Sequence, residues 1–458
     1  MTAAGVELAR DPVAWLQAHG GWLFERELGA CIVGSHALAI ACRRAGIAAP
    51  TPRDLDLAWS LDVDEGRALL ERRGVFVPTT DGSVQRGTLA LKIDHQRLEV
   101  TAFRDARPRN PLAQRIADDA AARDMTVGAL AVELATGVVH DPTGGLGHWQ
   151  QRRIVPVGDP GERVREHPVR WLRYYRKAHE WSFELDRSVR RLRLPPHVLA
   201  SVPREALGAE LRAALLYCAS PGRFFVDLHE IGVLAWLAPE LDLQFDGRPA
   251  GPQRWHPEIA QSLHLVLALE WAAANSQHLD ERDRLAVMVA VLCHDLGKGF
   301  TDAAELPGHP GHERLGVPHV HAFLRRFPGL LDRRGAALAQ DVCALHVEIR
   351  GMHELRPGTL ARLYDQHFRA RDYPIEPFAL AVAADSGGRL GLADAGRRVH
   401  EQVASDLRWL RRCCEAIDAT ALRTRCADLA AFRAALHEAR ARALGGGPPR
   451  AQKPDAKA

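Results

Sequence analysis

Arg53-Asp54-Leu55-Asp56-Leu57 begins a run in which polar and apolar side chains alternate, a pattern typical of a β-strand with one buried face. Side chains two residues apart on a strand point to the same face, so Asp54 and Asp56 would project together. Paired carboxylates are suitable ligands for the Mg²⁺ ions of phosphoryl-transfer sites. The spacing therefore predicts a magnesium site on this strand. The alternative interpretation is a solvated edge strand.

Upstream, Val33-Gly34-Ser35 ends one expected strand and begins a helix. Glycine lets a ligand approach the backbone closely, and the free amides at a helix N-terminus favour phosphate. By itself this pattern is more often a turn followed by a helix cap. These runs predict a small α/β head over roughly residues 28–155, with further strands at residues 55–59, 74–77, 89–93 and 97–103 and helices at residues 37–44 and 64–73.

Composition limits the class of protein. The length of 458 residues predicts two or three domains. With 47% hydrophobic and 26% charged residues, the chain is typical of a soluble globular protein, which excludes a fibrous repeat, a wholly disordered chain and a disulfide-stapled miniprotein. The net charge of +3 excludes a histone-like protein but leaves a local basic face open. The 22 histidines, many of them in one central stretch, indicate metal or acid–base chemistry.

The cysteines and the first ten residues indicate the cellular compartment in which the protein acts. The eight cysteines form no Cys-x-x-Cys pair, which argues against a zinc ribbon or a redox motif, and their scatter is typical of a reducing environment. Residues 1–10 lack the charged start and apolar core of a secretory signal. No uncharged apolar run reaches the roughly 18 residues of a membrane span. We therefore expect a cytoplasmic protein with no membrane partner.

The rest of the chain has a different texture. After Pro168 the strand patterns vanish, and long segments rich in Ala, Leu, Arg and Glu predict an all-helical remainder. The breaker-rich loop at residues 245–252 would divide this remainder. Residues 1–30 read as a helical extension that Gly20 and Gly21 break in two.

A second candidate site lies in the helical half. Residues 292–299 contain adjacent His294 and Asp295 at the expected end of a helix, where the two side chains would bind one metal ion together or bridge two. Further histidines lie on both sides of this pair, and a late carboxylate, Asp385, completes the set. A single histidine is usually a core or surface residue, so the prediction depends on the ordered set. A metal here would lower the pKa of a bound water and supply hydroxide near neutral pH.

These motifs resemble those of known families. Gly-Ser, a helix and Asp-x-Asp resemble the signature of the polymerase-β-type nucleotidyltransferase superfamily. The helical half resembles the HD-superfamily phosphohydrolases. Taken together, residues 31–390 resemble bacterial CCA-adding enzymes that carry an HD domain. Four stretches are similar to motifs of bacterial tRNA nucleotidyltransferases and poly(A) polymerases, at residues 98–104, 122–130, 140–147 and 166–176.

The resemblance implies an α+β fold, in which a polymerase-β-like nucleotidyltransferase head is followed by an all-α region containing an HD domain. The implied domains are an N-terminal helical extension (1–30), the head (31–155), a helical nucleotide- and tRNA-binding region (156–245), the HD phosphohydrolase domain (253–395), C-terminal helices (396–444) and a disordered tail (445–458).

In the head, the resemblance implies that Asp54 and Asp56 are catalytic and hold Mg²⁺. Guanidinium groups suit phosphate and base-edge acceptors. A solvated helix face is the alternative interpretation of the arginines at residues 170–176. The implied nucleotide-binding residues are Gly34, Ser35, Arg123, Asp124, His167, Arg170 and Arg173.

Three positions depart from the family pattern. Leu38 replaces an arginine of the Gly-rich motif, Gly128 replaces an asparagine, and His167 replaces the aspartate of the nucleotide-reading pair. A neutral histidine supplies a single acceptor, and a protonated one supplies none. The sequence therefore predicts an intact metal site beside a damaged base reader.

In the helical half, the resemblance implies a metal centre. The metal would be a divalent transition ion such as Ni²⁺ or Mn²⁺, because sets of histidine and carboxylate accept several ions. The implied ligands are His264, His294, Asp295 and Asp385, of which His294 and Asp295 would be catalytic. Four further histidines, His256, His309, His312 and His346, would support these ligands or bind phosphate.

The leading interpretation is a cytoplasmic tRNA nucleotidyltransferase-like enzyme that adds CMP and AMP, from CTP and ATP, to tRNA 3′ ends. Its HD half would hydrolyse 2′,3′-cyclic or 2′-phosphate ends. The alternative is an HD phosphohydrolase whose head is a degenerate, mainly RNA-binding remnant. A regulatory protein with neither activity is a third reading, against which the intact carboxylate and His-Asp sets argue. The oligomeric state stays open.

Overall fold

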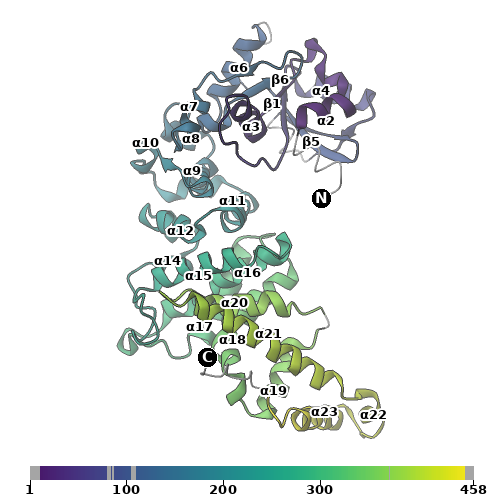
Figure 1. Cartoon of the computed structure of the whole chain (residues 1–458), viewed down its shortest axis with the longest axis vertical. Helices are drawn as coiled ribbons and strands as arrows, with labels where there is room; N and C mark the ends of the chain where they lie inside the picture. The colour runs from purple at the N-terminus through teal and green to yellow at the C-terminus, as the bar shows by residue number, and fades with distance from the viewer. Residues whose placement is uncertain (1–10, 80–83, 85–86, 105–109, 371, 449–458) are drawn as a thin grey trace, which may run out of the picture. The chain divides into compact units, whose positions relative to one another are not determined.

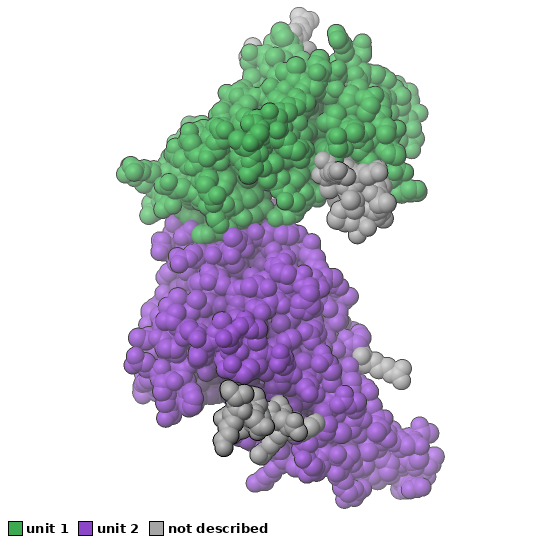
Figure 2. All heavy atoms as spheres, in the orientation of Figure 1, with its two compact units in different colours: residues 1–194 green, residues 195–458 purple. Residues whose placement is uncertain are grey.

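The computed structural model describes residues 11–79, 84, 87–104, 110–370 and 372–448. The start of the expected N-terminal extension and residues 449–458 of the expected tail lie outside these residues. The chain divides into two compact units, Met1–Leu194 and Pro195–Ala458 (Figure 2). This division falls inside the range expected for the helical nucleotide- and tRNA-binding region, and the finer domain boundaries stay predictions.

The described part of unit 1 is built on one mixed sheet of seven strands, in the order β3-β4-β5-β2-β1-β6-β7. The central strand β1 is fully buried, and it pairs antiparallel with β2 and β6. The pairing of β2 with β5 is parallel. The strands are β1 (Cys31–Val33), β2 (Asp56–Trp59), β3 (Phe76–Val77), β4 (Thr88–Ile93), β5 (Gln96–Ala102), β6 (Ala131–Glu133) and β7 (Val139–His140).

Helices before and between these strands follow local signals. Gly20 ends α2, and a 3₁₀ turn follows, so the expected break of the extension is confirmed. Asp62 and Glu65 form a capping box at the start of α4. A Cβ at Gly66 would lie 2.6 Å from the Trp59 ring, so α4 packs tightly on β2. These elements are α2 (Pro12–His19), α3 (Gly34–Arg44), α4 (Val63–Arg72) and α6 (Leu112–Ala121), with 3₁₀ turns at Gly21–Phe24, Arg26–Leu28 and Thr126–Gly128.

The end of unit 1 is helical, with one exception to the expectation. The prediction that no strand follows Pro168 is wrong, because β9 (Glu184–Leu185) pairs parallel with β8 (Arg153–Ile154). Strands of two residues are too short to show alternation, and they exist only through the partner that the fold supplies. The helices here are α7 (Gly145–Gln150), α8 (Pro160–Glu166), α9 (Val169–Trp181) and α10 (Arg187–Arg190).

Unit 2 is helical throughout its described part, and α15, α16, α18 and α20 lie side by side at its centre (Figure 1). Helix α16 is buried on all sides from Leu285 to Cys293, so its C-terminal end carries His294 and Asp295 into the interior. The main helices are α11 (Arg204–Tyr217), α12 (Pro221–Glu230), α13 (Val233–Leu237), α14 (Pro239–Asp242), α15 (Gln261–Asn275), α16 (Glu281–Cys293), α17 (His312–Arg326), α18 (Arg333–Arg350), α19 (Pro357–Leu363), α20 (Ile375–Gly387), α21 (Ala393–Glu415), α22 (Ala419–Thr424) and α23 (Leu429–Ala443).

Glycines allow the central helices to approach closely. A Cβ at Gly388 would lie 2.6 Å from the Cα atom of Ala268, and one at Gly387 would lie 2.5 Å from the Trp271 ring. The end of α20, which carries Asp385, therefore packs directly against α15, which carries His264. No helix in the described part of the chain is both long enough and apolar enough to cross a membrane.

Candidate functional sites

The head brings the Gly-Ser turn and the carboxylates together. Because β1 and β2 pair antiparallel with Val33 opposite Asp56, Gly34 lies beside that carboxylate. A Cβ at Gly34 would be 3.5 Å from Asp56 Oδ2, and its φ of 68° lies in the left-handed region that favours glycine. Ser35 follows in the first turn of α3. The backbone amides at the start of this helix thus lie next to the expected metal ligand.

The two expected carboxylates differ in position. Strand β2 begins at Asp56, and Asp54 lies in the bend before it, so the prediction that both belong to the strand is wrong by two residues. Strand β5 contributes Glu99, which is paired in parallel register with Asp56. The sequence reasoning quoted this stretch for its similarity but assigned Glu99 no role. The pairing register, which joins residues far apart in the chain, is what identifies it.

The surroundings of Asp56 favour a cation. Desolvation by the nearby protein raises the pKa of Asp56 to about 6, and repulsion from Asp54 and Glu99 adds to the shift. Arg123 opposes the shift. A divalent ion would remove this repulsion, so the three carboxylates fit the expected magnesium site.

The expected nucleotide-binding arginines are engaged inside unit 1. Arg123 pairs with Asp119 at 2.8 Å and donates to the carbonyl oxygen of Gly128 at 3.2 Å. Arg170, only 4% exposed, donates to Ala122 O at 2.7 Å. Arg173 Nη1 lies 2.9 Å from Asp124 Oδ2. The bonds of Arg170 and Arg173 hold α9 against Ala122 and Asp124. Nucleotide contacts of Arg123, Asp124, Arg170 and Arg173 stay predictions.

Two of the departures have clear structural consequences. Leu38 is fully buried in α3, so the position offers no donor to a triphosphate. His167 is exposed where α8 ends. Partial burial, with repulsion from Arg170, lowers the pKa of His167, so its ring is neutral at pH 7. A neutral ring there cannot replace the carboxylate of the family pattern.

In unit 2, three helical segments bring the four expected HD ligands together. His264 Nε2 on α15 lies 3.4 Å from Asp385 Oδ1 on α20 and 3.6 Å from Asp295 Oδ2 after α16. His294 Nε2 lies 3.1 Å from Asp295 Oδ2. Ligand atoms of His264, His294 and Asp385 all lie within 4.8 Å of one another. All four side chains are almost completely buried.

A second group shares Asp295. His312 Nε2 on α17 lies 3.2 Å from Asp295 Oδ1, and His346 Nε2 on α18 lies 3.7 Å from the same atom. Burial lowers the pKa of His346 to about 3, so its imidazole is neutral, the form that binds metal. These histidines were expected to support the ligands, and they lie where ligands themselves would.

Unpaired atoms show that this cluster fits a metal. His264 Nε2, His294 Nε2 and Asp295 Oδ1 are buried and have no hydrogen-bond partner among the described residues. Leaving such atoms unsatisfied costs free energy, which a bound cation would recover. The opposite ring nitrogens are engaged: Nδ1 of His264 bonds Glu258 at 2.9 Å, and Nδ1 of His294 bonds Val291 O at 2.7 Å. Each ring therefore keeps its Nε2 lone pair for the centre.

Glu258 is a functional residue that the sequence reasoning missed. Its Oε1 accepts from Nδ1 of both His256, at 2.8 Å, and His264, at 2.9 Å, and its Oε2 accepts from Leu390 N at 3.2 Å. Burial opposes ionisation, but the two histidine bonds lower the pKa of Glu258 well below its usual range. The only available signal was its place two residues after His256. His309 differs, because Thr301 and the Pro249 carbonyl occupy both its nitrogens.

A pocket of about 350 Å³ opens onto this cluster. Arg350 Nη1 lies 2.5 Å from Asp385 Oδ2, and Arg389 Nη2 lies 3.6 Å from Asp385 Oδ1. Lys298 Nζ lies 2.7 Å from Asp295 Oδ2, and with His294 it holds the pKa of Asp295 well below its usual range although burial opposes this. Cations around ligating carboxylates favour an anionic ligand.

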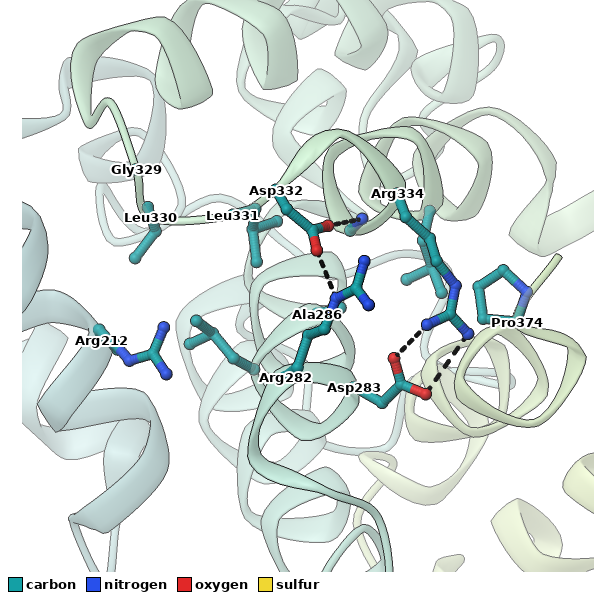
Figure 3. Close-up of a pocket in the computed structure, with 13 residues that line it drawn as sticks. Arg212, Arg282, Asp283, Ala286, Gly329, Leu330, Leu331, Asp332, Arg334 and Pro374 are labelled. Carbon is teal, nitrogen blue, oxygen red and sulfur yellow. Dashed lines mark hydrogen bonds and ion pairs between the residues drawn. The ribbon is translucent and has the colours of Figure 1, made fainter. Parts of the chain in front are cut away.

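A second pocket of unit 2, of about 200 Å³, is also lined by arginines that pair with aspartates (Figure 3). Arg282 pairs with Asp332, and Arg334 Nη1 lies 2.9 Å from Asp283 Oδ1. Its lining contains no histidine, so this pocket offers no comparable set of metal ligands.

The chain is similar to known proteins in both sequence and fold. Residues 42–155 match the model of the poly A polymerase head domain. The multifunctional CCA protein of Alkalilimnicola ehrlichii is 39% identical over 285 residues, which are 60% of this chain and 65% of that relative. The match therefore spans a little less than two thirds of the relative's length.

Solved structures agree on the fold. The Bacillus stearothermophilus CCA-adding enzyme in complex with CTP has a TM-score of 0.61 at 19% identity, and the match covers 98% of this chain and 94% of that one. The Thermotoga maritima CCA-adding enzyme complexed with tRNA has a TM-score of 0.57 at 14% identity, with 98% and 96% covered. The expected α+β fold, a mixed-sheet head followed by a helical region, is confirmed. The head-domain match and the shared sequence thus make this chain similar to CCA-adding enzymes and poly(A) polymerases.

Proposed function

We propose that the chain is a tRNA nucleotidyltransferase that transfers CMP and AMP, from CTP and ATP, to tRNA 3′ ends. The observation that carries the proposal is the close approach of Gly34 to Asp56, which brings a phosphate-binding helix start and a carboxylate to one point. A curated relative bears the name multifunctional CCA protein, which supports the same activity.

Asp54, Asp56 and Glu99 would hold Mg²⁺ in this reaction. The bound ion neutralises triphosphate charge and lowers the pKa of the attacking hydroxyl. The chain's own part is to bind and orient. The free amides at the start of α3 would receive phosphate oxygens, and the carboxylates of β2 and β5 would position the ion beside them. Action in the cytoplasm is part of this proposal.

The test is incubation of the full chain with tRNA that lacks its 3′ CCA end, supplying CTP and ATP separately and together. Extension that needs Mg²⁺ and follows the order C, C, A supports the proposal. An intact, folded protein that extends no tRNA would contradict it.

We also propose that unit 2 is a metal-dependent phosphohydrolase. The carrying observation is that buried ligand atoms of His264, His294 and Asp385 lie within 4.8 Å of one another, with Nε2 of both histidines lacking a hydrogen-bond partner among the described residues. A divalent transition ion such as Ni²⁺ or Mn²⁺ would be held by these residues with Asp385, and it would lower the pKa of a bound water. His312 and His346 would hold a second ion through the shared Asp295.

The proposed substrates are 2′,3′-cyclic or 2′-phosphate ends. In the cyclic case the water oxygen bonds to phosphorus, one bond from phosphorus to a ribose oxygen breaks, and that oxygen takes up a proton. Arg350 and Arg389 would orient the phosphate. Release of 2′- or 3′-monophosphate from adenosine 2′,3′-cyclic phosphate, dependent on added metal, is the test.

A second candidate is a phosphohydrolase with a head that only binds RNA. The buried Leu38 and the neutral His167 favour it, because both remove groups that the family pattern uses on the nucleotide. Cyclic-phosphate hydrolysis without any tRNA extension by the same preparation would establish this alternative.

A further inference from the structure

Large apolar side chains are exposed around the mouth of the metal pocket. Trp255 and Val347 line the pocket and are 56% and 39% exposed. Ile259, next to Glu258, is 57% exposed, and Leu390, next to Arg389, is 54% exposed. We call these four residues the apolar rim. Exposed apolar side chains beside a polar cavity are typical of a ligand-binding site.

The loop that carries Trp255 is tied down at several points. Trp255 N donates to Pro252 O at 2.8 Å, and Ala250 N donates to Ile259 O at 2.7 Å. Lys298 Nζ donates to Ala250 O at 2.7 Å, which anchors the loop to the metal cluster. The indole is therefore held in the open by a fixed backbone, with Arg254 5.3 Å from its ring centroid.

Backbone strain supports a functional role for this loop. Ile259 has a φ of 64°, which is strongly disfavoured for a β-branched residue. The turn directs Glu258 inward to His256 and His264 and leaves the Ile259 side chain in solvent. Strain of this kind persists where function requires it.

The pocket is thus cationic inside and apolar outside. Arg350 and Arg389 lie at the inner end beside Asp385, whereas Trp255 lies at the exposed mouth. A ligand that fits both ends carries an anion at one end and a flat apolar ring at the other. The volume of the pocket, about 350 Å³, is adequate for a mononucleotide.

We propose that Trp255, with the apolar rim, is the stacking platform for the nucleobase of the nucleotide whose phosphate enters the metal pocket. This inference depends on the proposed phosphohydrolase activity and deepens it. The site then selects phosphates that carry a nucleoside over phosphates that do not. Stacking on an indole accepts any base, so selection among the four bases is weak.

The test compares adenosine 2′,3′-cyclic phosphate with a base-free analogue, propane-1,2-diol cyclic phosphate, as substrates of the metal-loaded full chain. The ratio of kcat/KM for the two substrates measures what the base contributes. Trp255→Ala should lower this ratio about tenfold or more, mainly through KM for the nucleotide, because base–aromatic stacking is worth that much in affinity. Trp255→Phe, which keeps a ring, should retain most of the ratio.

A second readout and a control complete the experiment. Calorimetric binding of adenosine 2′-monophosphate should weaken in Trp255→Ala, while binding of inorganic phosphate should not. Leu429→Ala removes an equally exposed side chain on α23, outside the pocket, and should leave the ratio unchanged.

The outcomes separate the two proposals. If the wild type hydrolyses both substrates and Trp255→Ala leaves their ratio unchanged, the platform is refuted while the phosphohydrolase stands, and the rim serves another purpose such as docking a protein. If the wild type hydrolyses neither substrate with any divalent metal, the proposed activity fails and the platform fails with it.

Discussion

The head site and the HD site use the same kind of residues in opposite ways. In the head, Asp54 and Asp56 lie just before and at the start of the inner strand β2, and both are exposed. In unit 2, His264, His294, Asp295 and Asp385 are buried. His264 Nε2 lies 3.4 Å from Asp385 Oδ1, and His294 Nε2 lies 3.1 Å from Asp295 Oδ2, as ligands around a metal centre would. Groups of metal-ligating atoms within 4.8 Å of one another are found, among the described residues, only in unit 2.

The difference reflects what completes each site. Mg²⁺ keeps several waters and takes few protein ligands together with substrate phosphates, so its site stays open until the nucleotide arrives. A transition ion held by histidines is enclosed by the protein, and the cage must exist beforehand. On the proposed function, the head site would be completed by its nucleotide, whereas the residues of the HD site are already brought together by folding.

The largest expected effect separates the two sites outright. Asp54→Asn with Asp56→Asn should reduce nucleotidyl transfer to background, because two of the three proposed metal ligands of the head lose their charge. Hydrolysis of cyclic phosphate should continue unchanged. Single-nucleotide extension and phosphate-release assays on one preparation measure both. Asp64→Asn, an exposed carboxylate on α4, is the matched control, and loss of both activities in a folded double variant would show that the sites are not independent.

The reverse experiment attacks the buried site. His294→Ala or Asp295→Ala should lower the bound transition metal from stoichiometric to trace amounts and abolish hydrolysis, with tRNA extension retained. Elemental mass spectrometry of the purified proteins is the measurement. His278→Ala, which alters an exposed histidine of unit 2, should keep the metal. Full metal content in both ligand variants would place the centre elsewhere.

A subtler change tests whether the cage is pre-oriented. Glu258→Gln keeps the shape but removes the charge that holds Nδ1 of His256 and His264. Loss of such a partner typically weakens metal binding about 10- to 100-fold. Competition with a chelator of known affinity gives the dissociation constant. Unchanged affinity would mean that the ring orientation of His264 is set by packing alone.

The choice among nucleotides tests whether His167 occupies the base-reading position of the head. His167→Asp restores a carboxylate acceptor for the amino groups of C and A, and should improve discrimination against UTP roughly tenfold, the value of one hydrogen bond to a charged group. Single-nucleotide extension with CTP, ATP and UTP is the assay. Accurate C, C, A addition by the wild type would show that another group reads the base.

The smallest effect is on stability. The pKa of Asp56 is about 6 in the folded chain against 3.8 for the ordinary group, so between about pH 4 and 6 the folded state holds more protons than the unfolded state. Its contribution to stability therefore falls as pH rises through that window. Asp56→Asn should raise the free energy of unfolding above pH 6, by less than about 1 kcal/mol because the group is partly exposed, and should change it little below pH 4. Urea unfolding without Mg²⁺ at pH 4 and 7 is the check, and equal effects at both would contradict it.

Much of the fold followed from local pattern. Alternation at residues 89–93 and 97–103 predicted β4 and β5, and Gly20 predicted the break after α2. The short strands β6 and β7 were not predicted from the sequence. They exist through pairing with β1 and with each other.

The candidate sites divide in the same manner. The sequence alone predicted metal ligands at Asp54 and Asp56 and at His294 and Asp295, because residues one or two positions apart in the chain stay close together in any fold. Tertiary structure decided the rest: the register of β2 with β5 that adds Glu99, the helix packing that joins His312 and His346 to Asp295, and the loop that turns Glu258 inward. These residues come from separate segments, and their convergence depends on strand register and helix packing, which no local period encodes.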